Sequence, residues 1–190
     1  MGQAKTLTER ELKRVLDYVA LQRHAARNRA MVMLTYYAGL RVSEVAALKY
    51  ADVVSADSTI KHEFQLAAEQ TKGGHARVVF VGEKLRKELA AYVKTLKRYD
   101  QNQLPLFCTQ KRDGFTANTL CQHFHWLYRR AGIEGASSHS GRRTFITNLA
   151  AKGVGVRVLA SLAGHRSIAT TQAYIDVNDD QKRKAVELVF

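Results

Sequence analysis

The sequence predicts a mainly helical α+β domain with one small antiparallel sheet. Apolar residues recur at helical spacing over most of the chain, and the helical stretches are interrupted at glycines. Between Val53 and Val81, two short segments, "STIKHEFQLAAE" and "HARVVFVG", have the texture of strands. The 190 residues are 46% apolar with a single proline, which is enough for one core. Since no linker divides the chain, we expect a single domain over residues 1–190.

The first part of the chain predicts three helices. Thr8 and Glu11 form the pattern of a capping box at the start of "TLTERELKRVLDYVALQ", whose apolar stripe is Leu12, Val15, Leu16 and Val19. The segment "ARNRAMVMLTYYAGL" predicts a more buried helix that stops at Gly39. A short third helix is expected in "RVSEVAALKYADV", with its inward face formed by Val42, Val45, Ala46 and Leu48.

The middle of the chain predicts the sheet, and the remainder is helical. The paired glycines of "QTKGG" suit a tight turn between the two strands, with Lys72 at or beside that turn. "EKLRKELAAYVKTLKRY" predicts a helix, "QNQLPLFCTQKRDGF" a loop, and Thr116 to Phe190 four or five further helices.

The charge of the chain favours a polyanionic partner. Lys and Arg number 30 against 17 Asp and Glu, a net charge of +13 with neutral histidines. Such an excess favours nucleic acid over an acidic membrane surface or mere solubility. Cys108 and Cys121 have no motif spacing, and the sequence shows neither the apolar core of a signal peptide nor a membrane span. We therefore expect a cytoplasmic, nucleoid-associated protein with no membrane contact.

One C-terminal stretch contains the residue types that metal-free phosphodiester cleavage needs. "HSGRRTFITNLAAKGVGVRVLASLAGHRSIATTQAY" holds arginines, two histidines and a tyrosine. Arginine binds phosphate with a planar fork, histidine exchanges protons near neutral pH, and a tyrosyl phosphodiester conserves the energy of the broken bond.

Four motifs give the chain a family resemblance. They are "AGLRVSEVAAL", "TKGGHARVVFV", "HSGRRTFIT" and "LAGHRSIATTQAY", in that order, with Tyr174 nine positions after His165. Together they resemble the catalytic domain of the tyrosine recombinases, the phage integrase family, over nearly the whole chain. The resemblance implies that family's catalytic fold and a site-specific recombinase that cuts and rejoins DNA through a 3′-phosphotyrosyl intermediate.

The resemblance also implies a role for each matching residue. Arg41 and Arg142 would clamp the scissile phosphate, and Tyr174 would attack it. Glu44, three residues after Arg41, would lie on the same helix face and orient a group of the site. Lys72 would protonate the departing 5′ oxygen.

The two histidines have separate implied roles. His139 would handle the proton of the tyrosine, and His165 would hydrogen-bond the phosphate. No cofactor and no metal are implied, because transesterification is close to isoenergetic and the arginines supply the positive charge.

The second arginine motif departs from the family form His-x-Leu-Arg-His. Gly141 replaces the leucine and Arg143 replaces the last histidine, which puts local packing in question more than catalysis. The added charge of Arg143 is expected at the DNA backbone. Further DNA contacts are expected from the end of the helix "TLCQHFHWLYRRAG" and from beside the sheet, at Arg129, Arg130, Lys61 and Arg77.

Two features lie outside the catalytic motifs. His123 and His125 lack a third ligand at a suitable spacing, so we expect no metal site there. The apolar tail of "VNDDQKRKAVELVF" either packs on its own domain or, by family analogy, docks on a neighbouring protomer. The analogy implies a homo-tetramer on double-stranded DNA, with accessory DNA-bending proteins possible. It also suggests that the N-terminal core-binding domain of most members is not present in this chain.

Three other functions share part of the pattern. A type IB topoisomerase uses the same tyrosine chemistry as a monomer on one duplex, and a catalytically inactive DNA-binding relative would keep only the charge. A metal-dependent nuclease would lose its activity in EDTA. The order and spacing of the motifs favour the recombinase.

Overall fold

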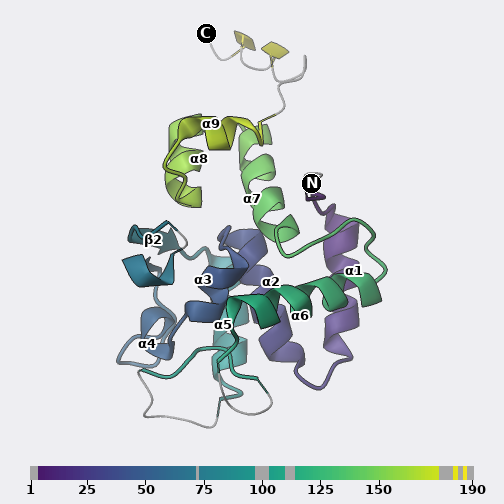
Figure 1. The fold of residues 1–190 in the computed structure, drawn as a ribbon, viewed down its shortest axis with the longest axis vertical. Coiled ribbons are helices and arrows are strands. Elements are labelled where there is room, and N and C mark those ends of the chain that lie inside the picture. Colours follow the sequence, from purple (N-terminus) through teal and green to yellow (C-terminus); the bar gives the residue numbers. More distant parts are fainter. Residues whose placement is uncertain are drawn as a thin grey trace.

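A computed structural model describes residues 4–71, 73–96, 103–109, 114–175, 182–183 and 186–187 of the chain. Helix α2 (Ala25–Tyr37) lies at the centre and packs against four other helices. These are α1 (Glu9–Ala20), α3 (Val42–Ala47), α5 (Glu83–Val93) and α7 (Ser140–Ala151). Figure 1 shows α7 rising from this body towards α8 (Val156–Ala163) and α9 (Ile168–Gln172), which lie above it. The described part of the chain is therefore a helical body with α8 and α9 at one end.

The start of the chain folds as its sequence predicts. The side chain of Thr8 accepts a hydrogen bond from the amide of Glu11, whose carboxylate accepts one from the amide of Thr8, so the capping box is confirmed. The apolar stripe of α1 faces the core, and α2 is buried along most of its length. Gly39 follows α2 with φ +63°, a left-handed conformation in which a helix commonly ends.

The expected third helix is divided into two. Helix α3 stops at Leu48, whose φ of −63° and ψ of 133° are extended, and α4 (Tyr50–Val53) follows. Lys49, between them, forms an isolated antiparallel bridge with Pro105. The Lys49 amide also donates to the Asp52 carboxylate at 2.8 Å, so the break coincides with a distant contact and with the N-terminal cap of α4. The four predicted inward-facing side chains, Val42, Val45, Ala46 and Leu48, are nevertheless buried.

The two predicted strands pair as an antiparallel sheet. β1 (Glu63–Leu66) and β2 (Arg77–Phe80) align with Glu63 opposite Phe80 and Leu66 opposite Arg77. The connection between them is longer than the tight turn that the glycines suggested, and it contains a 3₁₀ helix, η1 (Ala68–Gln70). Lys72 belongs to this connection but lies outside the described residues.

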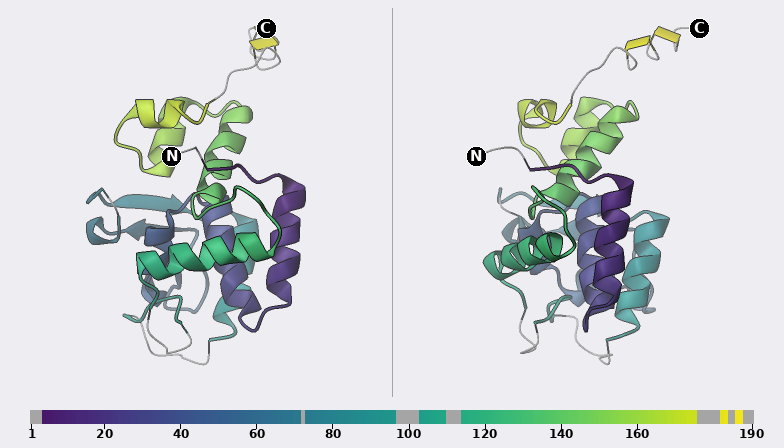
Figure 2. Two further views of the ribbon diagram at one scale, coloured as in Figure 1. Left: turned by 45° about the vertical axis from the view of Figure 1, so that its right-hand side comes forward. Right: turned by 90° about the vertical axis from the view of Figure 1, so that its right-hand side faces the viewer.

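The second half of the chain supplies α6 (Ala117–Arg130) and the helices α7 to α9. Figure 2 shows α6 and α5 on opposite sides of the α1–α2 pair. Within the described ranges, no helix is long and apolar enough to cross a membrane. The expected docking of the C-terminal tail falls on residues 176–190, of which only four are described.

Candidate active site

Arg41 is placed by the junction between α2 and α3. It is the residue before α3 rather than part of the helix, which differs from the expected pairing with Glu44 on one helix face. Glu44 instead caps the helix start: its Oε2 accepts from the Arg41 backbone amide at 2.8 Å, and its Oε1 accepts from Arg41 Nη1 at 2.9 Å. One carboxylate therefore fixes both the backbone and the guanidinium of Arg41.

Glu44 is fully buried, and it is charged because cations surround it. Its Oε2 also accepts from Arg77 Nη2 at 2.7 Å. Burial alone would raise the pKa of Glu44, but the hydrogen bond and charge of Arg77, the Arg41 amide and the charge of Arg142 together lower it. The carboxylate offsets part of the positive charge that three arginines bring to this site.

Arg142 projects from the first turn of α7 and is only 4% exposed. Its Nη1 donates to the Gly39 carbonyl at 2.6 Å and its Nη2 to the Ala163 carbonyl at 2.5 Å. Burial, together with the charge of Arg41, lowers the pKa of the guanidinium, which stays cationic at neutral pH. Arg142 thus joins the end of α2 to the end of α8.

His165 follows the left-handed Gly164 that ends α8. Its Nδ1 lies 2.9 Å from the hydroxyl of Thr171, a fully buried residue of α9. Burial, followed by the charges of Arg142, Arg41 and Arg77, lowers the pKa of His165 to about 4. The imidazole is therefore neutral at physiological pH in the DNA-free protein.

Tyr174 lies just after α9, beside His165 and Arg143. Its ring stacks on the His165 ring at a centroid separation of 5.8 Å and an interplanar angle of 22°. The guanidinium carbon of Arg143 lies over the tyrosine ring, 5.5 Å from the centroid. Tyr174 thus contacts both His165, nine residues before it, and Arg143 of α7, from which α8 and α9 separate it in sequence.

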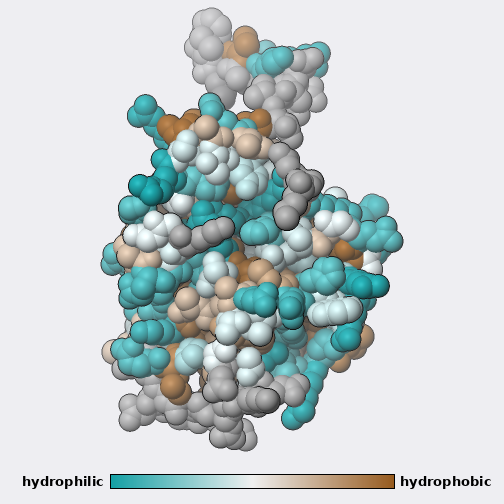
Figure 3. Space-filling model, viewed as in Figure 1, coloured by the Kyte–Doolittle hydropathy of each residue, from teal (hydrophilic) through white to brown (hydrophobic). Residues whose placement is uncertain are grey.

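Two cavities meet at this cluster. The first, about 440 Å³, is lined by Arg41, Glu44, Thr71, Gly73, His75, Ala76, Arg77, Gly164, His165, Arg166, Ser167 and Thr170. The second, about 370 Å³, is lined by Ala4, His139, Arg143, Thr170, Ala173 and Tyr174. Thr170 lines both, so the arginine side and the tyrosine side of the site adjoin. Figure 3 shows a hydrophilic band on one face between α8–α9 and the body below.

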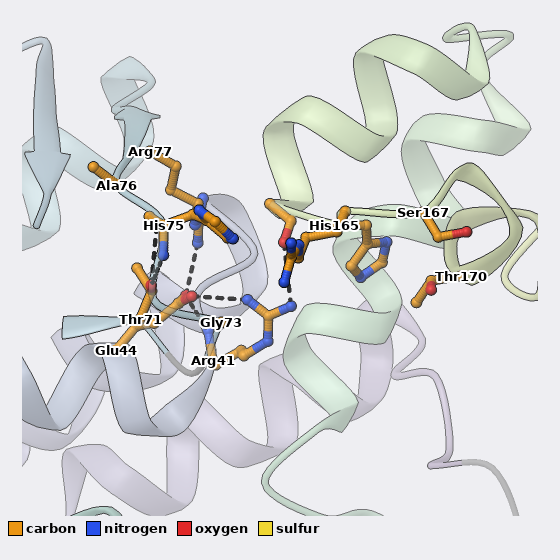
Figure 4. Close-up of a pocket in the computed structure, with 12 residues that line it drawn as sticks. Arg41, Glu44, Thr71, Gly73, His75, Ala76, Arg77, His165, Ser167 and Thr170 are labelled. Carbon is orange, nitrogen blue, oxygen red and sulfur yellow. Dashed lines mark hydrogen bonds and ion pairs between the residues drawn. The ribbon is translucent and has the colours of Figure 1, made fainter. Parts of the chain in front are cut away.

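Figure 4 shows how the first cavity is built. Arg41, Glu44, His75 and Arg77 project from one side, and His165, Ser167 and Thr170 from the other. Several guanidinium groups beside one carboxylate make this a cationic hollow, suited to an anion such as a phosphodiester.

The structure brings the predicted catalytic residues together, except Lys72, whose place it does not describe. Arg41, Arg142, His165 and Tyr174 form the connected cluster described above, and His139, at the start of α7, shares a cavity with Tyr174. Lys72 is outside the described residues, but its neighbours Thr71 and Gly73 both line the first cavity. The connection that carries Lys72 therefore passes along the site.

The residues expected to contact DNA differ in their surroundings: two are exposed, and two others lie against groups of the protein. Arg129 and Arg130 are exposed at the end of α6, with both guanidinium groups over the Trp126 ring. Arg143 lies over Tyr174 rather than pointing away from it. Lys61 directs its Nζ to the Ala51 carbonyl at 2.6 Å.

Arg77 differs most from its expected place at the surface of the sheet. Its side chain is 8% exposed and binds Glu44 within the site. Arg77 shares the buried face of β2 with Val79 and Val81, because residues two apart on a strand share a face. The sequence does not mark this face, since Val78 and Phe80 on the exposed face are also apolar. His75, Ser167 and Thr170 also line the site, and no pattern marks them either.

The histidines of α6 lie away from this site. His123 is half-buried with its Nε2 3.1 Å from Asn28 Oδ1, whereas His125 is exposed. Over the described part of the chain, no three His, Cys, Asp or Glu side chains are grouped so as to hold a metal ion.

Comparison with known proteins identifies the family of this chain. The model of the phage integrase family matches residues 5–181. The chain belongs to the phage integrase family. The arginines, histidines and tyrosine described above lie within the matched region, which is the catalytic domain of the tyrosine recombinases.

Relatives with curated descriptions agree with the family assignment. Tyrosine recombinase XerA of Thermococcus kodakarensis is 34% identical over 185 residues, which cover 96% of this chain and 62% of that protein. Tyrosine recombinase XerD of Rickettsia bellii is 28% identical over 93% of this chain and 61% of its own. The chain thus spans about three fifths of the length of these phage integrase relatives.

Solved structures confirm the fold. The crystal structure of XerA recombinase superposes with a TM-score of 0.75 at 27% identity, covering 99% of this chain and 64% of that one. The catalytic domain of bacteriophage HP1 integrase gives a TM-score of 0.69 at 21% identity and is covered over 96% of its length. The predicted α+β fold, mainly helical with one small antiparallel sheet, is that of the phage integrase catalytic domain.

Proposed function

We propose that this chain is the catalytic domain of a site-specific DNA recombinase, acting as one unit over residues 1–190. The observation that carries the proposal is that Arg41 and His165 line one cationic hollow, with Arg142 bound to the α8 end beside them and Tyr174 stacked on His165. Three segments of the chain, around Arg41, around Arg142 and from His165 to Tyr174, supply one nucleophile and the phosphate-binding groups that it needs. Double-stranded DNA is the substrate that fits this chemistry and the net charge of +13.

The arginines hold the scissile phosphate. A guanidinium has five N–H donors. Arg41 uses two of them, on Glu44 and on the Gly164 carbonyl, and Arg142 uses two, on the Gly39 and Ala163 carbonyls. The remaining donors serve the non-bridging oxygens and stabilise the charge that develops in the transition state. His165 adds a neutral donor: when its Nδ1 accepts from the Thr171 hydroxyl, its Nε2 carries the hydrogen for the phosphate.

Tyr174 makes the covalent bond. Its Oη attacks phosphorus, the bond to the 5′ oxygen breaks, and a 3′-phosphotyrosyl link forms with release of a 5′-hydroxyl. The phenol proton passes to His139, which shares the second cavity with Tyr174, and Lys72 supplies a proton to the leaving oxygen. Attack by a 5′-hydroxyl from another duplex reverses the step and joins the exchanged strands.

Recombination requires more than one protomer. We propose that four copies act on two DNA sites and are linked through the C-terminal segment, with DNA-bending proteins as possible accessories. In this proposal the protein works on the DNA of the nucleoid in the cytoplasm. The direction of the reaction, whether integration, excision or inversion, follows from the DNA sites and the assembly rather than from the chemistry of the cavity.

The proposal is tested by capturing protein-linked DNA under denaturing conditions from cells that express the chain, with EDTA in the lysis buffer. DNA linked to the parent and to Tyr18→Phe, but not to Tyr174→Phe, is the expected result. Sequencing the linked fragments reveals the site.

The alternatives predict other outcomes. Covalent links scattered without sequence preference, together with relaxation of supercoiled DNA by the monomer, would favour a type IB topoisomerase. DNA binding with no link in any variant would favour an inactive relative, and cleavage abolished by EDTA would favour a metal-dependent nuclease.

A further inference from the structure

Three arginines from three other parts of the fold donate hydrogen bonds to the C-terminal end of α8. Three successive carbonyl oxygens each accept from a different guanidinium: Leu162 from Arg77 Nη1 at 2.9 Å, Ala163 from Arg142 Nη2 at 2.5 Å, and Gly164 from Arg41 Nη2 at 3.4 Å. The arginines come from β2, from α7 and from the residue before α3. The position of the α8 end is therefore set by elements outside it.

These contacts satisfy the open end of a helix. The last carbonyls of a helix lack intrahelical partners and carry its partial negative charge. In α8 the carbonyls of Ala160 and Ser161 accept from the amides of His165 and Gly164. The next three carbonyls are those that the arginines bind. Since His165 is the following residue, the same contacts set where its imidazole lies.

Arg77 has a second partner within the site. Its Nη2 donates to Glu44 Oε2 at 2.7 Å, while its Nη1 donates to the Leu162 carbonyl. Glu44 in turn holds Arg41 through both the backbone and the guanidinium. Arg77 thus joins Glu44 to the α8 end beside His165 with two short hydrogen bonds, next to the longer direct bond from Arg41 to the Gly164 carbonyl.

The stem of Arg77 also packs closely on the helix end. Gly164 has φ +62°, and a Cβ placed there would clash with Arg77 Cδ and lie 3.0 Å from Arg77 Nε. Glycine is thus required both by the backbone conformation and by the close approach of the arginine.

We propose that Arg77 is a positioning residue that fixes His165 relative to Arg41. The inference rests on the proposed function, in which those two side chains bind one phosphate. Arginine suits this role because its planar fork directs two nitrogens to the two acceptors, whereas a lysine ammonium is a single point on a flexible stem. Losing the bond of Arg77 to Glu44 or its bond to the Leu162 carbonyl would displace His165 relative to Arg41.

The first test needs no DNA. Amide resonances of the Arg77→Lys protein are compared with those of the parent by NMR. The control is Arg29→Lys, which breaks a similar two-nitrogen pair with Glu88, between α2 and α5. We expect Arg77→Lys, but not the control, to shift the resonances of residues 162–165 and of Thr171. Shifts confined to β2 would overturn the proposal.

The second test separates cleavage from binding. On the DNA site recovered by the capture experiment, single-turnover formation of the tyrosyl link by Arg77→Lys is expected to fall about 100-fold, the cost typical of a misplaced reacting group. DNA affinity is expected to be unchanged. Cleavage at the parental rate would overturn the proposal. A parent that forms no link would instead refute the proposed function, and the NMR comparison would still decide the role of Arg77.

A double-variant comparison covers the case in which Arg77→Lys does not fold. Glu44→Gln removes the buried charge that Arg77 neutralises, so Arg77→Gln is added in that background and the two proteins are compared. If Arg77 also acts through Leu162, adding Arg77→Gln to the Glu44→Gln protein shifts the resonances of residues 162–165. It also slows cleavage below the rate of Glu44→Gln alone. If it changes neither, Arg77 serves only to neutralise Glu44 and the proposal is wrong.

Discussion

The guanidinium of Arg143 lies over the ring of Tyr174, with 5.5 Å between its central carbon and the ring centroid. This arginine stands where the family form of the motif has a histidine. The sequence suggested a DNA backbone contact for the added charge. The structure places that charge against the side chain that we propose as the nucleophile.

Arg143→Gln is expected to slow formation of the tyrosyl link. The cation–π contact is worth about 0.5–2 kcal/mol, so its loss predicts a decrease of about 2- to 30-fold in the cleavage rate. Single-turnover cleavage at saturating protein measures this effect. If only DNA affinity falls and the rate at saturation is unchanged, Arg143 acts as a backbone contact and the prediction is wrong.

Gly141, the second departure from the family motif, is explained by the packing of α7 on α2. A Cβ at this position would clash with the Thr35 hydroxyl and lie 2.9 Å from Thr35 Cβ. Gly141→Ala is therefore expected to destabilise the fold by about 1–3 kcal/mol, the usual cost of overpacking. Urea unfolding measures the change.

The partner substitution supplies the control for this prediction. Thr35→Ala removes the hydroxyl oxygen that lies nearest to the Cβ of an alanine at position 141. The double variant is therefore expected to recover part of the free energy of unfolding that Gly141→Ala loses. If Thr35→Ala and Gly141→Ala are simply additive, the two residues are not coupled and the packing explanation fails.

Local patterns were sufficient for much of the fold. The capping box of Thr8 and Glu11, the stop at Gly39 and the two strands all depend on residues close in sequence, and all are present. The motif residues of the site were found through the family resemblance. Geometry then showed that Arg41, Arg142, His165 and Tyr174 form one cluster.

The missed features depend on contacts between distant segments. The break between α3 and α4 lies at the bridge of Lys49 to Pro105, a distant contact, and the Asp52 carboxylate that accepts from the Lys49 amide starts α4 locally. Strand alternation does not predict the burial of Arg77, because Val78 and Phe80 make the exposed face of β2 as apolar as the buried one. Its acceptor on α8 could not be predicted either, because it is a backbone carbonyl. Backbone acceptors have no sequence signature.

Glu44→Gln is expected to destabilise the protein by about 3 kcal/mol, because it leaves buried cations without their counter-charge. The lowered pKa of Glu44 implies that its contribution is present above the unfolded value of 4.5 and is lost as the pH falls below it. Urea unfolding at pH 7 measures the cost.

Sulfate provides a specific check on that explanation. If the loss comes from uncompensated arginines, sulfate is expected to raise the melting temperature of Glu44→Gln more than that of the parent. Equal shifts in melting temperature in the two proteins would show that the Glu44 carboxylate stabilises the fold through packing more than by neutralising the arginines.

His123 predicts a pH dependence of stability in the acid range. Burial, then the charges of Arg27 and His24, lower its pKa from 6.5 to about 4. Between these values the unfolded chain binds a proton that the folded protein does not, so stability falls as the pH decreases from about 6.5 to about 4. His123→Gln is expected to flatten this slope in urea unfolding measured between pH 7.5 and pH 4.5. The exposed His125→Gln is the matched control, and equal slopes in the two variants would contradict the assignment.

The exposed end of α6 predicts how DNA binding depends on salt. Arg129 and Arg130 lie over Trp126, which is 50% exposed, so both charges are held at the surface on a fixed platform. Each phosphate contact contributes about −0.9 to the slope of log K against log salt concentration. Arg129→Gln with Arg130→Gln is therefore expected to reduce the magnitude of the slope by about 1.8 if both arginines bind phosphate. Fluorescence anisotropy over a salt series measures it.

The matched control for this prediction removes the same charge from the opposite side of the helical body. Lys84→Gln with Lys87→Gln alters two exposed cations on α5, which Figure 2 shows on the far side of the α1–α2 pair from α6. That pair is expected to leave the slope unchanged, because counterions are released only where a side chain meets a phosphate. Equal reductions in both pairs would mean that the net charge of +13 acts as a diffuse field rather than through a defined α6 contact.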